Sequence, residues 1–236
     1  MAFPQTISES KSNSNRSPVW LRIAFWLSIA ISVAVVIRRL VALASPPGNA
    51  PPQLGQLDKT FASHATLTLA HIVPALLFVF VAPFIVFRRQ HLMVALERAF
   101  YVLGAIVGIT AYAMSTYSVG GWIERSAVLV FDSLFLFSMS QAYVFRRRLN
   151  PAHERVWQLR AIAVLLGIAT TRPVMGVFFA TARLTHLVPA QFFGIAFWIG
   201  FSINVLVFEF WIRSAHRRYS REAPALIRDP QTRSAL

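Results

Sequence analysis

The chain has 236 residues, of which 56% are hydrophobic and 14% charged, and its formal net charge is +14. Such an apolar composition excludes an ordinary soluble domain, and the charge does not indicate nucleic acid, because the arginines stand in short groups at the ends of apolar runs. The absence of cysteine excludes disulfides, iron–sulfur clusters, thiol nucleophiles and c-type haem attachment.

The N-terminal part combines a polar tail, an apolar run and a Pro/Gly-rich segment. Residues 1–17 are rich in Ser and Asn, which predicts a disordered tail. The apolar run 19–37 is the first predicted span. Residues 42–44 (ALA) resemble a signal-peptide cleavage site, but Arg38 and Arg39 lie between them and the apolar core, which favours an uncleaved helix. Residues 45–57 are predicted to form a loop.

Five further apolar runs follow, at residues 65–87, 99–117, 127–145, 159–182 and 189–212. Each is close to the roughly 20 residues that a helix needs to cross about 30 Å of hydrocarbon, and none has the period of a strand. Residues 214–236 are basic and polar and are predicted to form a loose cytoplasmic tail. The predicted fold is therefore an all-α integral membrane protein, with a bundle of six transmembrane helices over residues 18–213.

The arginines predict how this bundle is oriented, because basic residues gather on the cytoplasmic side of short connections. One side of the predicted bundle holds Arg88, Arg89, Arg98, Arg146, Arg147, Arg148, Arg155, the N-terminal Lys11 and Arg16, and the tail arginines. The opposite side holds Arg38, Arg39, Lys59, Arg125 and Arg183. Both termini of this multi-pass protein are therefore predicted to be cytoplasmic. Arg38 and Arg39 are the exception, interpreted as side chains that reach back to the lipid headgroups.

Three ionisable residues lie well inside the predicted spans: His71, Asp132 and Arg172. A charge at membrane depth costs about 3 kcal/mol or more, so it needs partners inside the bundle. The similar depths of these residues predict an Asp132–Arg172 ion pair with His71 nearby. Residues of this kind are candidates for a functional site, and the alternative is a purely structural role.

A second group of polar residues lies toward the predicted cytoplasmic side. Arg160 and Glu209 lie at one depth, where they form either an ion pair or two separate side chains that reach the interface. Asn204 lies about 140° around the helix from Glu209, which favours a hydrogen bond between helices over a shared ligand site. The complete predicted polar cluster comprises His71, Asp132, Arg160, Arg172, Asn204 and Glu209.

The sequence leaves the function open between several classes. The histidines fall at two levels, which is the pattern of b-type haem or quinone-linked membrane proteins, and His71 and His153 would be the haem ligands. The polar cluster alternatively lines a transport or ligand site, or fixes helix register in a scaffold or assembly factor. No catalytic motif and no metal-binding motif is found, so an enzyme is the less favoured class. The expected partner is the lipid bilayer, with a homo-oligomer or a second membrane protein left open.

Several short motifs occur in an order that resembles a known family. His71 is followed by APFIVF at residues 82–87, Arg98 by YVL at residues 101–103, and Asn204 by Glu209 in an N-x4-E pair; the segment from His153 to Arg172 adds Trp157 and Arg160. Over about residues 60–213 the chain resembles the bacterial predicted membrane proteins grouped as domain of unknown function 2306. Met93-Val94 stands where that family has His-Arg. The resemblance implies a multi-helix membrane protein and no particular activity.

Overall fold

The computed structural model of the chain describes residues 19–45, 52–87 and 93–228, and within them all regular structure is helical. The helices are α1 (Val19–Ala44), α2 (Pro52–Ser63), α3 (Ala65–Val86), α4 (Met93–Ser115), α5 (Gly121–Arg147), α6 (Pro151–Leu165), α7 (Gly167–Thr185) and α8 (Pro189–Arg228). Six helical segments are long and apolar enough to cross a membrane, with α6 and α7 together as one of them. The predicted six-span helical fold is confirmed. The predicted disordered tail at residues 1–17 lies outside the described residues.

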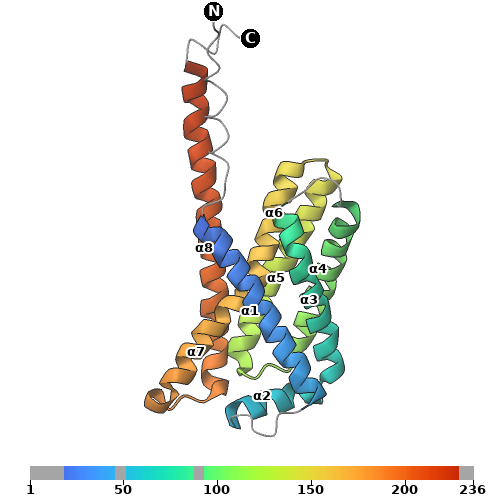
Figure 1. Cartoon of the computed structure of the whole chain (residues 1–236), viewed down its shortest axis with the longest axis vertical. Coiled ribbons are helices and arrows are strands. Elements are labelled where there is room, and N and C mark those ends of the chain that lie inside the picture. Colours follow the sequence, from blue (N-terminus) through green and yellow to red (C-terminus); the bar gives the residue numbers. More distant parts are fainter. Residues whose placement is uncertain (1–18, 46–51, 88–92, 229–236) are drawn as a thin grey trace, which may run out of the picture.

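The helices pack mainly as neighbours in the chain, with α5 at the centre. α5 contacts α4, α6 and α8, while α3 packs against α4 and α7 packs against α8. α1 crosses the outside of the bundle obliquely and contacts α2, α3 and α7 (Figure 1). The short α2 lies across the end of the bundle where α1 ends and α3 begins (Figure 1).

Two predictions for the polar segments were wrong. The segment 45–57 was expected to be a loop, but α2 begins within it at Pro52. Proline is well tolerated at the first position of a helix, where its missing N–H has no partner to lose. The basic segment after Ser214 was expected to be a loose tail, but α8 continues to Arg228, and this extension contains several Ala, Arg and Glu residues, which are good helix formers.

The fifth predicted span, 159–182, is interrupted in the structure. α6 ends at Leu165 and α7 begins at Gly167, so the chain changes helix near the middle of the span. A Cβ at Gly167 would lie 2.5 Å from the Phe201 ring of α8, so only glycine allows this close approach. α6 also begins earlier than expected, at Pro151, because the Asn150 side chain caps it by accepting a hydrogen bond from the His153 amide.

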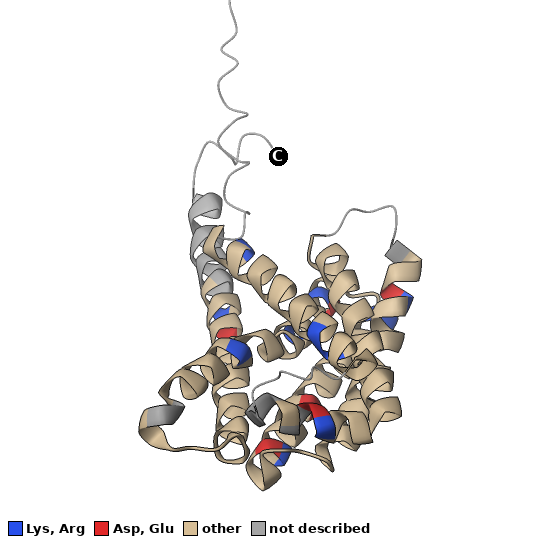
Figure 2. Ribbon diagram, turned by 60° about the horizontal axis from the view of Figure 1, so that its bottom comes forward, with Lys and Arg blue, Asp and Glu red and all other residues tan. Residues whose placement is uncertain are grey.

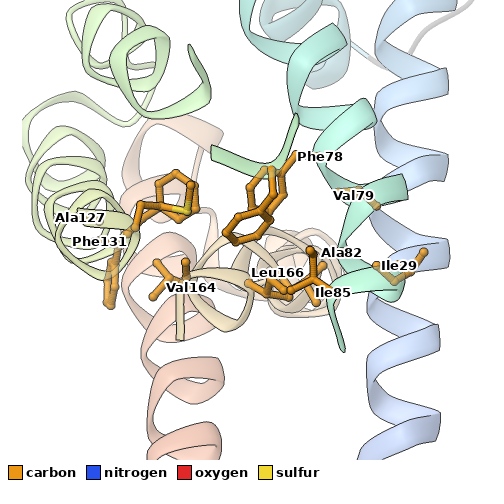
Figure 3. Packing of buried hydrophobic residues seen from close by; sticks show 14 residues of the cluster. Ile29, Phe78, Val79, Ala82, Ile85, Ala127, Phe131, Val164 and Leu166 are labelled. Atoms are coloured by element: carbon orange, nitrogen blue, oxygen red, sulfur yellow. The ribbon is translucent and has the colours of Figure 1, made fainter. Parts of the chain in front are cut away.

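Aromatic and small residues form the core where α3, α4, α5 and α6 meet. The rings of Phe78 and Phe100 have centroids 4.8 Å apart, and Phe135 meets Phe78 edge-on at 5.8 Å. Ala82 of α3 and Ala127 of α5 are almost fully buried nearby (Figure 3). Small residues let helix backbones approach closely, which stabilises bundles in lipid, where the hydrophobic effect between helices is weak.

The outward faces carry large apolar side chains, among them Leu77, Phe80, Phe84, Leu206 and Phe210. Contiguous apolar surface of this kind is costly in water and favourable in hydrocarbon. The helices therefore present a surface suited to a lipid bilayer.

Gly200 and Gly176 provide a test of the α7–α8 packing. A Cβ at Gly200 would lie 2.6 Å from the Thr171 backbone, whereas a Cβ at Gly176 would meet nothing within 4 Å. We expect Gly200→Ala to lower the free energy of unfolding by about 1–3 kcal/mol through overpacking. Gly176→Ala should leave it unchanged or raise it by up to about 1 kcal/mol, since alanine favours helix. Thermal unfolding in mild detergent measures both, and equal effects of the two variants would contradict the close approach.

Candidate functional site

A cavity of about 260 Å³ lies inside the bundle, in the half next to α2. Most of its walls are apolar, and its charged or titratable lining residues are Arg39, His71, Tyr117, Glu124, Asp132 and Arg172. Three members of the predicted polar cluster, His71, Asp132 and Arg172, thus face one space. The structure separates them from the other three.

His71 reaches the cavity from the second turn of α3. Its Nδ1 lies 2.9 Å from the hydroxyl oxygen of Thr110 on α4. The Thr110 hydroxyl lies 2.7 Å from the Ile106 carbonyl oxygen and donates to it. Because the hydroxyl proton is used in that bond, Thr110 accepts from Nδ1 of His71, and in a neutral imidazole Nε2 is then the acceptor.

Asp132 and Arg172 both line the cavity, but the predicted ion pair between them is wrong. No contact within ion-pair distance joins them, although both side chains are described. Asp132 is 8% exposed, and its Oδ2 is buried with no hydrogen-bond partner among the described residues. The Nε atom of Arg172 is also buried with no hydrogen-bond partner among the described residues. Its Nη1 lies 3.8 Å from the sulfur of Met175. The two side chains thus face the same cavity without meeting across it.

Glu124 is a cavity residue that the sequence analysis missed. It is 7% exposed in the first turn of α5, and its Oε2 accepts a hydrogen bond of 2.6 Å from the Gly120 amide. A carboxylate in the first turn is favourable, because the N-terminal amides and the helix dipole both stabilise negative charge. The predicted span began at residue 127, so Glu124 was assigned to a connection. The Gly-Gly pair just before it is the signal that could have marked the earlier helix start.

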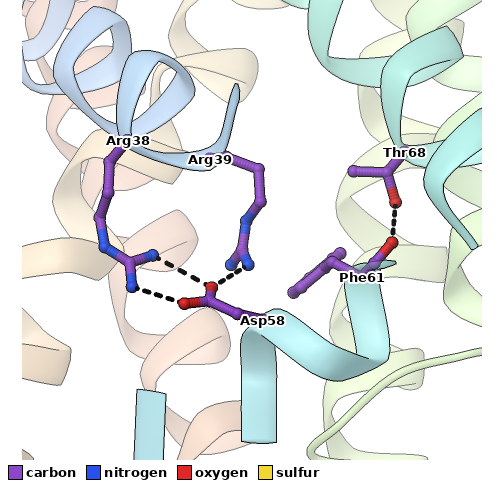
Figure 4. A network of polar contacts seen from close by, with 5 residues as sticks. All are labelled: Arg38, Arg39, Asp58, Phe61 and Thr68. Atoms are coloured by element: carbon purple, nitrogen blue, oxygen red, sulfur yellow. Dashed lines mark hydrogen bonds and ion pairs between the residues drawn. The ribbon is translucent and has the colours of Figure 1, made fainter. Parts of the chain in front are cut away.

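A second missed residue, Asp58, joins α1 to α2 at the edge of the cavity. Its carboxylate binds Arg39 at 2.6 Å and Arg38 at 3.1 Å (Figure 4). The Arg39 guanidinium also lies 3.9 Å from the centroid of the Phe61 ring, and both residues line the cavity. The Thr68 hydroxyl donates to the Phe61 carbonyl, which ties α2 to α3 as well. We call Arg38, Arg39 and Asp58 the α1–α2 latch.

The latch changes the interpretation of the two outer arginines. Acidic and basic residues lie close to one another along the ribbon at this end of the bundle (Figure 2). The side chain of Arg39 is only 14% exposed, so it faces the protein and does not reach toward headgroups. Arg38 is 46% exposed. Asp58 balances one of the two positive charges locally. The positive-inside rule counts Lys and Arg alone, so the two arginines stay an exception to it.

The other half of the predicted cluster is a separate set of contacts between α6, α7 and α8. Arg160 and Glu209 form a two-point ion pair, with nitrogen–oxygen distances of 2.6 and 3.2 Å, which confirms one of the two predicted alternatives. The Asn204 amide donates to the Ala163 carbonyl at 2.6 Å, and its oxygen accepts from the Thr170 hydroxyl at 3.0 Å. Asn204 therefore links three helices, as predicted for a helix–helix hydrogen bond.

His153 lies apart from both groups. It is exposed in the first turn of α6, with its ring stacked on Phe145 at a centroid distance of 5.1 Å. It does not line the cavity that His71 faces. The structure thus does not bring the two predicted haem ligands to one site. Within the described residues, no group of three or more His, Asp or Glu side chains is arranged to hold a metal ion.

Comparisons with protein-family models, curated proteins and solved structures found no match to this chain. The resemblance to domain of unknown function 2306 stays a prediction based on motifs. The chemistry of the cavity is therefore inferred from its own residues.

Asp58 and Asp132 form a matched pair for testing the site, because each is 8% exposed and only Asp58 has ionic partners. We expect Asp58→Asn to lower the free energy of unfolding by about 2 kcal/mol, since it removes charged hydrogen bonds to two arginines. Asp132→Asn should not destabilise the ligand-free protein, because the buried carboxylate it replaces has an unsatisfied oxygen. Thermal unfolding in detergent compares them, and a larger loss for Asp132→Asn would mean that Asp132 has a strong partner.

Proposed function

We propose that the protein binds a small, largely apolar molecule within its transmembrane bundle, as the binding step of transport across the membrane. One observation carries this proposal: the Nε of Arg172 and the Oδ2 of Asp132 are buried beside one cavity without hydrogen-bond partners among the described residues. Buried polar atoms nearly always have partners in folded proteins. A bound molecule that completes both hydrogen bonds accounts for this pair.

Ser32, which also lines the cavity, has an unsatisfied hydroxyl oxygen as well, but the atoms of Arg172 and Asp132 belong to charged side chains and define the charged or polar groups of the ligand. Arg172 can only donate, so the ligand offers it an acceptor such as a carboxylate. Asp132 as a carboxylate can only accept, so the ligand offers it a donor such as an ammonium or a hydroxyl. The remaining ligand surface is apolar, because the walls are mostly aliphatic and aromatic. The cavity of about 260 Å³ is slightly below the usual range for drug-sized ligands, which favours a small molecule.

The position of the cavity supports transport. It lies beside α2 and the latch at one end of the bundle, and Arg39 and Phe61 form part of its wall there. Toward the other end, Phe78 lies about two helical turns beyond His71 on α3, where it packs with Phe100 and Phe135. A polar site near one face, separated from the other face by packed side chains, suits a protein that opens to one side at a time.

Three probes with one carbon skeleton test the ligand class. Leucine has a carboxylate and an ammonium, isocaproate lacks the ammonium, and isoamylamine lacks the carboxylate. We expect leucine to bind most tightly, with a loss of about tenfold or more for each missing group, since a hydrogen bond to a charged group contributes about 1.5–3 kcal/mol. Titration calorimetry on the purified full chain measures the three affinities.

Variants show whether binding occurs at the cavity. Arg172→Gln and Asp132→Asn should each weaken leucine binding by about tenfold or more. Arg147→Gln should not, because Arg147 is exposed on α5 and does not line the cavity. No binding of any probe, or equal binding by wild type and the Arg172 and Asp132 variants, would contradict the proposed site.

We further propose that the protein lies in a bacterial inner membrane with both termini in the cytoplasm. The distribution of arginines supports this orientation, since the connections after α3 and α5 are the basic ones.

Reporter fusions in a bacterial host test the orientation. Alkaline phosphatase, which is active only outside the cytoplasm, should be active when fused after Ser63 and inactive when fused after Arg148. A green fluorescent protein at the C-terminus should fluoresce. The reverse pattern would place α2 and the cavity on the cytoplasmic side.

A further inference from the structure

A second cavity, of about 850 Å³, lies at the end of the bundle away from α2. α1 forms one side of it, and α6 and α8 form the other, with the end of α3 between them. Its volume is in the usual range for ligand sites. It shares none of the residues of the first cavity, so nothing inferred here depends on the proposed function.

Two arginines give the second cavity a positive charge. Arg22 of α1 and Arg155 of α6 both line it. The Arg155 Nη2 donates to the Val86 carbonyl at 2.9 Å, which positions this guanidinium at the end of α3. The Arg22 guanidinium lies 5.9 Å from the centroid of the Phe87 ring. Guanidinium groups from two helices at one end of a cavity suit an anion.

The walls match a lipid better than a free ion. Near the arginines the lining is aromatic, with Trp20, Phe25 and Trp211. Deeper in the bundle it becomes aliphatic, with residues such as Ile162 and Leu166. Tryptophan is enriched where headgroups meet the hydrocarbon, so the charged part of the cavity lies at the level of lipid phosphates. A charged mouth followed by an apolar interior corresponds to a phosphate followed by an acyl chain.

We propose that this cavity binds an anionic phospholipid from the leaflet on the side where α1 begins. The phosphate lies between Arg22 and Arg155, and one acyl chain runs along the aliphatic wall between α1 and α8. Basic pockets between transmembrane helices recognise anionic headgroups in this way, and guanidinium groups suit phosphate because they offer paired N–H donors.

Native mass spectrometry of the full chain tests the proposal. The protein is released from mild detergent after incubation with equal amounts of phosphatidylglycerol and phosphatidylcholine that have identical acyl chains. We expect one phosphatidylglycerol to be retained in preference to phosphatidylcholine. Glycerol phosphate, which has the phosphate without acyl chains, should neither bind nor displace the lipid at the same concentration.

Arg22→Gln is the main variant, because Arg22 is exposed and its replacement leaves the Arg155–Val86 hydrogen bond in place. It should reduce retention of phosphatidylglycerol by about fivefold, the effect of one basic residue near an anionic lipid. Arg148→Gln is the matched control: it removes an exposed arginine from the same end of the bundle and should change nothing. Thermal unfolding confirms that both variants are folded.

Three results would overturn the proposal. The first is equal retention of phosphatidylglycerol by wild type and Arg22→Gln. The second is equal retention of phosphatidylglycerol and phosphatidylcholine by wild type. The third is displacement of the lipid by glycerol phosphate, which would identify a site for free phosphate.

Discussion

A charged side chain at membrane depth has no bulk water around it, so the protein itself must supply its partners. The bundle meets this constraint in different ways. Asp58 is held by Arg38 and Arg39, and Glu124 by a backbone amide at the start of its helix. Asp132 keeps one unsatisfied oxygen beside a cavity. A buried polar atom without a partner lowers the stability of the ligand-free protein and is free to form a hydrogen bond with a ligand. The cavity beside Asp132, and not the complete ion pairs, is therefore the candidate site.

The two ends of the bundle use similar residues for different purposes. On the side of α2, charged residues surround a small cavity and connect it to a short surface helix. On the other side, Arg160, Glu209 and Asn204 are occupied with one another and with backbone groups, so they hold α6, α7 and α8 in register. Ionic contacts that are already complete stabilise packing and have little capacity left for a ligand.

Features that depend on position along the helix axis were predicted well from the sequence. The six spans follow from apolar length, and the Arg160–Glu209 pair follows from depth. Features that depend on direction around the axis were not. Asp132 and Arg172 were placed at similar depths and both line one cavity, but similar depth does not bring two side chains into contact across it. Asp58 was missed because proline and glycine around it suggested a loop, and no local pattern indicates a partner on another helix.

α1 is one of the helices that line both cavities. Its C-terminal half provides Val36 and Arg39 to the first cavity, and its N-terminal half provides Trp20 and Arg22 to the second. It lies on the outside of the bundle, and few of its residues are buried. A straight rod that tilts about its middle moves its two ends in opposite directions. A tilt of α1 therefore reshapes both cavities together, and occupants of the two would act on each other's affinity reciprocally through this one helix.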